Sequence, residues 1–157
     1  MIIQSINYVP LIKLIDKIIH ILSINRCKTT RMNKLKLSKI ISEIFIKHGL
    51  NKLHSKICSD ALINAELVGA HSHGLSRIKM YCERIKKRLI NPQPKIRLKK
   101  ISQSITHIDA DNSIGFVAAD TAIKKSIQNA KKTGIGMVAV KNSGHYGLSG
   151  YYAEQAV

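Results

Sequence analysis

The tetrapeptide 91 NPQP 94 divides the chain into two stretches with different hydrophobic periodicity. Two prolines so close together end a helix and disfavour helical backbone in the residues before them. Before this break, apolar residues recur at the spacing of amphipathic helices; after it, alternating segments surround a single helical one. We therefore predict an α/β (α+β) chain, with a helical subdomain over residues 32–94 and the start of an α/β domain over residues 95–157.

Three helices are predicted before the break. The first stops at Gly49 and the second near Gly69, because glycine is the usual residue just after a helix end. The third covers residues 75–89. The inward face of the first helix is predicted to be Leu37, Ile40, Ile41, Ile44 and Phe45. That of the second is Ile57, Cys58, Ala61, Leu62 and Ala65, and that of the third is Ile78, Cys82, Ile85 and Leu89.

A strand–helix–strand unit is predicted after the break. Residues 95–101 and 104–110 alternate as strands do. Residues 115–134 have the spacing of a helix, and residues 135–140 form a short apolar run. The helix carries a small-residue face, and the whole arrangement is typical of a βαβ unit. That face is predicted to consist of Ala118, Ala119, Ala122, Ile123, Ile127 and Ala130.

The stretch 134 GIGMVA 139 matches the letters of the dinucleotide-binding pattern G-x-G-x-x-A. In that motif the glycines follow a strand and open a helix, whose N-terminus meets the pyrophosphate. Here they end a predicted helix and open a predicted strand. We therefore reject this match.

Residues 1–31 differ in character from the rest and are predicted to be an N-terminal extension. Residues 9–24 have amphipathic helical spacing, interrupted by charges that make them a poor transmembrane span. Such a helix could lie on a membrane surface. It could equally be a translated upstream stretch, since Met32 begins a more ordinary domain start, and we favour this second interpretation.

The net charge of +17 invites a nucleic-acid or anionic-membrane partner. The lysines are spread over most predicted helices, and no aromatic residues are interleaved with them to stack on bases. We therefore attribute the charge to composition and expect no specific nucleic acid and no membrane partner. The three scattered cysteines form no C-x-x-C pair, so reduced thiols in a cytoplasmic protein are expected.

The stretch 70 AHSHG 74 is the first candidate for chemistry. In an extended segment His71 and His73 would point the same way and could ligate a metal, with His107, Asp109 or Asp111 as third ligand. Alternatively, Ser72 or His73 simply caps the following helix. A third interpretation is a reactive polar cluster in a loop between rigid helices. We predict no metal site.

Two further candidates follow. Arg77 and Tyr81 are four residues apart and share a helix face, where they could hold a carboxylate through a bidentate pair and a third hydrogen bond. A surface arginine beside a half-buried tyrosine is the alternative. His145 lies in the glycine-rich loop 141 KNSGHYGLSG 150 after a strand, which suits a general acid or base; a structural histidine is the alternative.

Taken together, these segments resemble a known family. In order they are AELVGAHSHGLSRIKMYCERI, INPQP, HIDADNSIGFVAADTAIKKSIQNAKKTGIGMVAV and NSGHYGLSGYYAEQA. The chain from Met32 to Val157 resembles the malate/L-lactate dehydrogenase family, which includes ureidoglycolate, sulfolactate and diketogulonate dehydrogenases or reductases. Its nucleotide-binding fold is a mixed sheet of non-Rossmann type.

The resemblance implies an enzyme that uses NAD or NADP to interconvert a 2-hydroxy acid and its 2-oxo acid, usually as a homodimer. It places the acid/base role on His145 or on His73. It places the substrate carboxylate on Arg77, with Ser72 and Tyr81 as polar neighbours. Most cofactor-binding residues of the family would lie beyond Val157, so those of this chain are unknown. We expect a truncated family member that is inactive alone.

Overall fold

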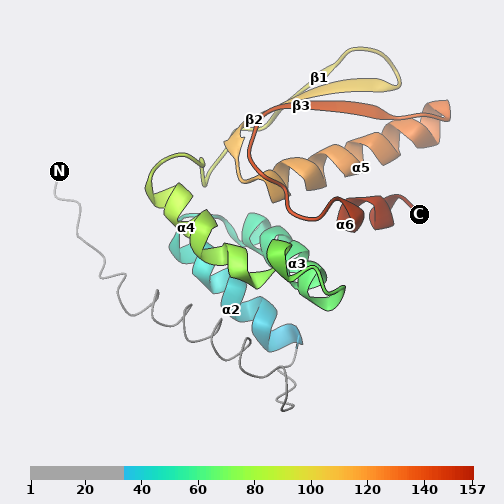
Figure 1. Ribbon diagram of the computed structural model, residues 1–157. Helices are drawn as coiled ribbons and strands as arrows, with labels where there is room; N and C mark the ends of the chain where they lie inside the picture. Colours follow the sequence, from blue (N-terminus) through green and yellow to red (C-terminus); the bar gives the residue numbers. More distant parts are fainter. Residues whose placement is uncertain (1–33) are drawn as a thin grey trace, which may run out of the picture.

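The computed structural model describes residues 34–157, which form the coloured ribbon in Figure 1. The extension predicted for residues 1–31, including its amphipathic helix, lies outside the described residues. Among those described, no helix is long and apolar enough to cross a membrane.

Within the described residues, three α-helices precede the proline-rich break, as predicted. They are α2 (Lys34–Lys47), α3 (Lys52–Leu67) and α4 (Ile78–Lys86). Gly49, with φ +96°, allows the tight turn after α2. Asn51 then caps α3, because its side-chain oxygen accepts a hydrogen bond from the His54 N–H at 2.8 Å.

The third helix differs from its prediction at both ends. Residues that were expected to begin it form two short 3₁₀ turns, η1 (His71–His73) and η2 (Leu75–Arg77). At the other end Arg88 has a positive φ of 58°, which turns the chain away before the prolines. As a result Leu89 is 57% exposed, and Ile90 is buried in its place.

The sheet has the order β1-β2-β3, formed by β1 (Arg97–Lys100), β2 (Ile105–Ser113) and β3 (Met137–Ser143). β1 pairs antiparallel with β2, whereas β2 pairs parallel with β3, so the sheet is mixed. Helix α5 (Gly115–Thr133) joins β2 to β3 and completes the predicted βαβ unit. Gly134, with φ +79°, ends α5, which confirms that this glycine closes a helix rather than opening one.

Asp111 ties the break to the sheet. Its Oδ2 accepts hydrogen bonds from Asn91 Nδ2 and from the Lys95 N–H, both at 2.9 Å. Asp111 and Asn112 have positive φ values and lie where β2 shifts register. This irregularity extends β2 to Ser113, three residues beyond the predicted end, and sets the start of α5.

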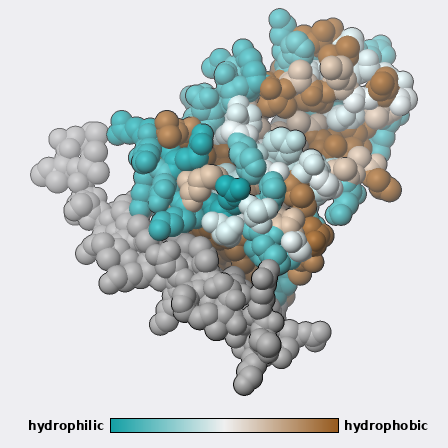
Figure 2. Space-filling model, in the orientation of Figure 1, coloured by the Kyte–Doolittle hydropathy of each residue, from teal (hydrophilic) through white to brown (hydrophobic). Residues whose placement is uncertain are grey.

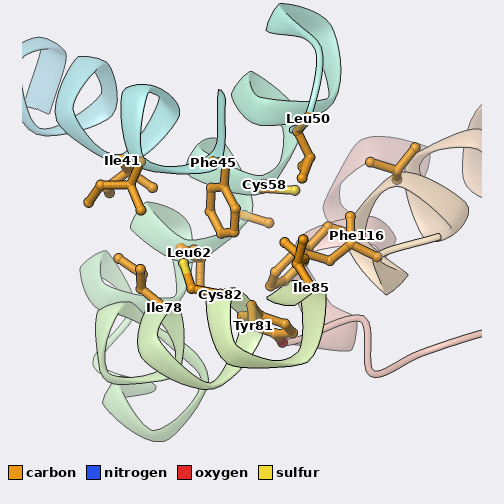
Figure 3. Close-up of a cluster of buried hydrophobic side chains, with 14 of the residues drawn as sticks. Ile41, Phe45, Leu50, Cys58, Leu62, Ile78, Tyr81, Cys82, Ile85 and Phe116 are labelled. Carbon is orange, nitrogen blue, oxygen red and sulfur yellow. The ribbon is translucent and has the colours of Figure 1, made fainter. Parts of the chain in front are cut away.

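One hydrophobic core joins the helices to the start of α5 (Figure 3). Helix α5 runs along the sheet in Figure 1, and its first turn brings Phe116 and Val117 into the core of α2, α3 and α4. A last helix, α6 (Ser149–Ala153), packs against α3 and α5 and leads into a 3₁₀ turn, η3 (Glu154–Ala156). The loop from β3 to α6 passes beside α4, where His145 meets Tyr81.

The outer edge of the sheet is exposed in the described part of the chain. β3 has a strand partner only on its β2 side, and most of its residues are exposed. Apolar side chains gather over the sheet and α5 in Figure 2, and exposed ones include Leu98, Ile135 and Met137. Such a strand edge favours association with other chains.

Candidate functional site

The fold brings the five predicted site residues to one place. η1 carries Ser72 and His73, Arg77 ends η2, Tyr81 lies on α4, and His145 comes from the loop after β3. The Tyr81 hydroxyl lies 2.7 Å from His145 Nδ1. The rings of His73 and His145 stack, with centroids 5.7 Å apart and planes inclined by 28°.

Glu66, near the end of α3, organises the histidine loop. Its Oε1 accepts a hydrogen bond from the Leu75 N–H at 2.8 Å, and its Oε2 pairs with His71 Nδ1. Its side chain also occupies the space that a Cβ on Gly74 would need, so a larger residue there would displace the Glu66 carboxylate. Sequence reasoning missed Glu66, because its contacts cross the end of a helix and leave no periodic signal.

The two histidines of this loop do not converge on a common point as the extended-segment hypothesis required. His71 turns to Glu66, whereas His73 Nδ1 lies 3.0 Å from the Ser72 hydroxyl. The 3₁₀ turn explains the difference, because residues two apart in it do not point the same way. Within residues 34–157, no three His, Cys, Asp or Glu side chains are grouped so as to hold a metal ion.

Arg77 is half-buried and anchored through one nitrogen. Its Nε donates a 2.6 Å hydrogen bond to the carbonyl oxygen of Ser72. The two terminal Nη groups make no hydrogen bond with any described residue. Two parallel N–H donors on a planar group match the two oxygens of a carboxylate, so this arrangement can receive an acid end-on.

Tyr81 is more deeply placed than the sequence suggested. It is 1% exposed, and its ring lies 4.9 Å from that of Phe116, at the edge of the core beside Ile85 (Figure 3). Its hydroxyl meets His145 Nδ1, whereas the sequence predicted that it would bond a carboxylate beside Arg77. Burial raises the pKa of Tyr81 to about 12, so the hydroxyl keeps its proton at neutral pH.

His145 has a ring that is exposed on one side and held on the other. Loss of water around part of the ring lowers its pKa, and the nearby positive charges of His73, Arg77 and Arg84 lower it further. The imidazole is therefore neutral at pH 7. Neighbouring cations also make the surrounding space attractive to an anion.

Gly147 completes the loop around His145 and was not predicted as a site residue. Its N–H donates to His145 Nδ1 at 3.3 Å. Its φ of +82° favours glycine, and a Cβ there would lie 2.6 Å from Phe116 Cε1. The Tyr152 hydroxyl supports the same loop by donating to the Tyr146 carbonyl oxygen at 2.9 Å.

A groove of about 470 Å³ adjoins the His145 loop, between α5 and β3. It is lined largely by small and apolar side chains of α5, by Val138 and Val140, and by Gly144 and Tyr146 next to His145. None of the lining side chains is charged. The groove fits a flat, uncharged ring in size and lining, but no cationic side chain in it could pair with a phosphate.

The site therefore combines three chemical capacities. It offers an arginine fork for a carboxylate, two imidazoles that can hold or accept a proton, and cations that favour a negatively charged ligand. These are the groups that acid/base chemistry at a carbon next to a carboxylate requires.

Comparisons with known proteins identify the family of this chain. Residues 32–157 match the family model described as malate/L-lactate dehydrogenase. The chain is 40% identical over 126 residues to a malate dehydrogenase of Pyrococcus abyssi, which covers 80% of this chain and 35% of that protein. It is 37% identical over 119 residues to an L-sulfolactate dehydrogenase of Methanocaldococcus jannaschii, with 76% and 35% covered.

Solved structures give the same result. The malate dehydrogenase structure from Pyrococcus horikoshii OT3 superposes with a TM-score of 0.77 at 40% identity, covering 80% of this chain and 36% of that one. The sulfolactate dehydrogenase structure from Methanocaldococcus jannaschii gives 0.76 at 35% identity, with 79% and 36% covered. The chain thus spans about a third of the length of its relatives, and it belongs to the malate/L-lactate dehydrogenase family.

Proposed function

We propose that this chain supplies the carboxylate-binding and proton-transfer groups of an NAD- or NADP-dependent dehydrogenase that interconverts a 2-hydroxy acid and its 2-oxo acid. The observation that carries the proposal is the pair of open Nη groups on Arg77 beside two stacked imidazoles. Relatives named for malate, L-sulfolactate and ureidoglycolate support this substrate class. One of them is named as dependent on NAD(+).

Arg77 orients the substrate in this proposal. Its Nε is already bonded to Ser72, so the guanidinium is held in place before the acid arrives. Binding the carboxylate at the two Nη groups fixes the direction of the adjoining C2 atom. Such fixed orientation of reacting groups can lower a barrier by several kcal/mol.

The imidazoles exchange a proton with the C2 oxygen. Oxidation of the hydroxy acid requires the hydroxyl proton to leave, and reduction of the oxo acid requires a proton to return. His73 and His145 are the acid/base candidates that lie next to Arg77. Ser72 acts through the ring that it contacts, because its hydroxyl meets His73 Nδ1.

A bound nicotinamide cofactor supplies the hydride chemistry. The groove between α5 and β3 suits its uncharged ring, with Gly144 and Tyr146 placed between this groove and His145. Its phosphates need cationic donors that the groove lacks, so we propose that the remaining two-thirds of the relatives' length provides them. A homodimer and a cytoplasmic location, where Cys58 and Cys82 stay as free thiols, belong to the same proposal.

Binding of L-malate to the 157-residue chain tests the substrate-binding part directly. We expect malate to shift the ring resonances of His73 and His145 in NMR spectra, and Arg77→Ala to weaken binding at least tenfold. A hydrogen bond to a charged group contributes about 1.5–3 kcal/mol. Arg97→Ala, which removes an exposed arginine from β1, is the matched control. Equal affinity in all three proteins would overturn the proposal.

The same preparation separates this function from its alternative, a basic module that binds nucleic acid or anionic lipid. That alternative requires binding that falls steeply between low and moderate salt and does not depend on Arg77.

We also expect no NAD(P)H-linked turnover by residues 1–157 alone, measured by nicotinamide absorbance. The reason is that the chain covers only about 35% of the relatives' length.

A further inference from the structure

We propose that Tyr81 and Gly147 are positioning residues that hold His145 in the neutral tautomer protonated on Nε2. In this state His145 is a hydrogen-bond donor to the C2 oxygen of the substrate, and acceptance of the hydroxyl proton falls to His73. The assignment of this tautomer rests only on the geometry of the chain. The division of roles between the two histidines rests on the proposed function.

The backbone of Gly147 decides which nitrogen carries the proton. Its N–H can only donate, and it points at His145 Nδ1 across 3.3 Å. Nδ1 must then present a lone pair, because an N–H in that position would face another N–H. Neutral imidazole carries one proton, so in this arrangement the proton is on Nε2.

With Nδ1 unprotonated, the Tyr81 hydroxyl can only donate to it, so Tyr81 and Gly147 share its single lone pair. The Tyr81 hydroxyl lies 2.7 Å from Nδ1 and keeps its proton, because the pKa of Tyr81 is raised to about 12. The ring cannot turn away easily, since it is 1% exposed and packs against Phe116. Phe116 also lies where a Cβ on residue 147 would be, so the same aromatic ring secures both donors.

The charged groups around His145 also favour its neutral form. The groups that face it are His73 from η1, Arg77 from η2, and Arg84 and Tyr81 from α4. Arg77 and Arg84 are permanently cationic and oppose a second proton on the ring, as does His73 whenever it is protonated. Neutral His145 is therefore the form present near pH 7, and its Nε2 makes no hydrogen bond with a described residue.

This tautomer separates the roles of the two histidines. A neutral imidazole with its proton on Nε2 donates a hydrogen bond but cannot accept a hydroxyl proton at that nitrogen. During oxidation the hydroxyl proton would pass to a ring nitrogen of His73, while the C2 hydride leaves with its electron pair to the nicotinamide. His145 keeps its own proton and holds the oxygen as it becomes a carbonyl.

Nitrogen-15 NMR of the free chain tests the tautomer without any ligand. We expect His145 Nδ1 to show the shift of an unprotonated nitrogen, Nε2 to show that of a protonated one, and a scalar coupling to link the Gly147 amide to Nδ1. In Tyr81→Phe we expect the fraction protonated on Nδ1 to rise at least twofold. Tyr146→Phe, in the same loop, is the matched control and should leave the fraction unchanged. A protonated Nδ1 in the unaltered chain overturns the inference, whether or not the variants fold.

Binding measurements distinguish a failure of this inference from a failure of the proposed function. Oxaloacetate offers only acceptors at C2, so His145→Gln, which keeps a donor, should bind it within about threefold of the unaltered chain, while His145→Leu should bind at least tenfold more weakly. Equal loss in both variants contradicts the donor role. If oxaloacetate and malate do not bind at all, the proposed function fails, whereas the tautomer measurement still decides the role of Tyr81 and Gly147.

Discussion

His73 and His145 stack with ring centroids 5.7 Å apart, although 72 positions of sequence separate them. One ring is held by a turn between two helices and the other by a loop between a strand and a helix. The contact makes the charge of His73 one of the causes that lower the pKa of His145. A variant that changes the local charge should therefore change the pKa of His145.

The first prediction concerns Arg77. Its positive charge is among the causes that lower the pKa of His145, so Arg77→Gln should raise that pKa toward the usual value for histidine. An NMR titration of the His145 ring measures the change. Arg97→Gln removes the same charge from β1 and should leave the titration as it was. A His145 pKa that does not respond to either substitution would show that Arg77 is not beside it.

The second prediction concerns Gly147. Alanine at this position must adopt a φ of +82° and place its Cβ 2.6 Å from Phe116 Cε1. We expect Gly147→Ala to lower the free energy of unfolding by about 1–3 kcal/mol and to shift the His145 ring resonances, since the N–H moves away from Nδ1. Urea unfolding and NMR spectra measure the two effects.

Gly134→Ala is the matched control for that variant. Gly134 has a φ of +79°, close to that of Gly147, but a Cβ there meets nothing within 4 Å. Gly134→Ala should therefore lower the free energy of unfolding through the strained backbone conformation alone, without a collision. It should leave the His145 ring resonances unchanged. If both variants lose equal stability, contact with Phe116 does not restrict residue 147.

The third prediction concerns Glu66. Glu66→Ala removes the acceptor of the Leu75 N–H and the partner of His71, so the loop that carries His73 loses its main support. We expect a loss of about 1–3 kcal/mol in the free energy of unfolding and faster hydrogen exchange at Leu75. Glu43→Ala, at an exposed position on α2, should change neither. Unchanged exchange at Leu75 in Glu66→Ala would contradict this role.

The helices and the βαβ unit could be predicted because local patterns determine them. Gly134 ends α5 and Asn51 starts α3 through interactions within a few residues. Alternation in β2 and helical spacing in α5 likewise record which face meets the core. These patterns can be read from the sequence because each helix or strand places its apolar residues on the face that it buries.

The features that sequence reasoning missed depend on contacts between distant residues. The 3₁₀ turns at 71–77 follow from the hydrogen bonds of Glu66, and the exposure of Leu89 follows from the positive φ of Arg88. The hydroxyl of Tyr81 was expected to bond a carboxylate beside Arg77, and its contact with His145 could not be predicted because His145 lies in a segment 64 positions away. The sequence could indicate five side chains that lie close together in the structure, but it could not indicate their hydrogen bonds or the roles of Glu66 and Gly147.

The fourth prediction concerns pH and stability. Burial lowers the pKa values of His48, His54 and His145 from the ordinary 6.5 in the folded chain. The unfolded state then binds more protons in this range, so the free energy of unfolding rises with pH. Stability is present above about pH 6.5 and is lost as pH falls through the folded values. Urea unfolding at about pH 7.5 and 5.5 should show the loss, and His48→Gln should reduce it; stability that is flat over this interval contradicts the prediction.

The fifth prediction concerns the exposed edge of β3. Met137 is 58% exposed, and no strand in the described part of the chain pairs with the outer side of β3. Unpaired backbone groups beside apolar side chains favour association of copies, and lysine on such an edge opposes it. We expect the chain to associate as its concentration rises, and Met137→Lys combined with Ala139→Lys to reduce this association in light-scattering measurements. Leu53→Lys, which adds charge at an exposed position on α3, should reduce it less. Equal effects of the two changes would mean that net charge, rather than the β3 edge, governs association.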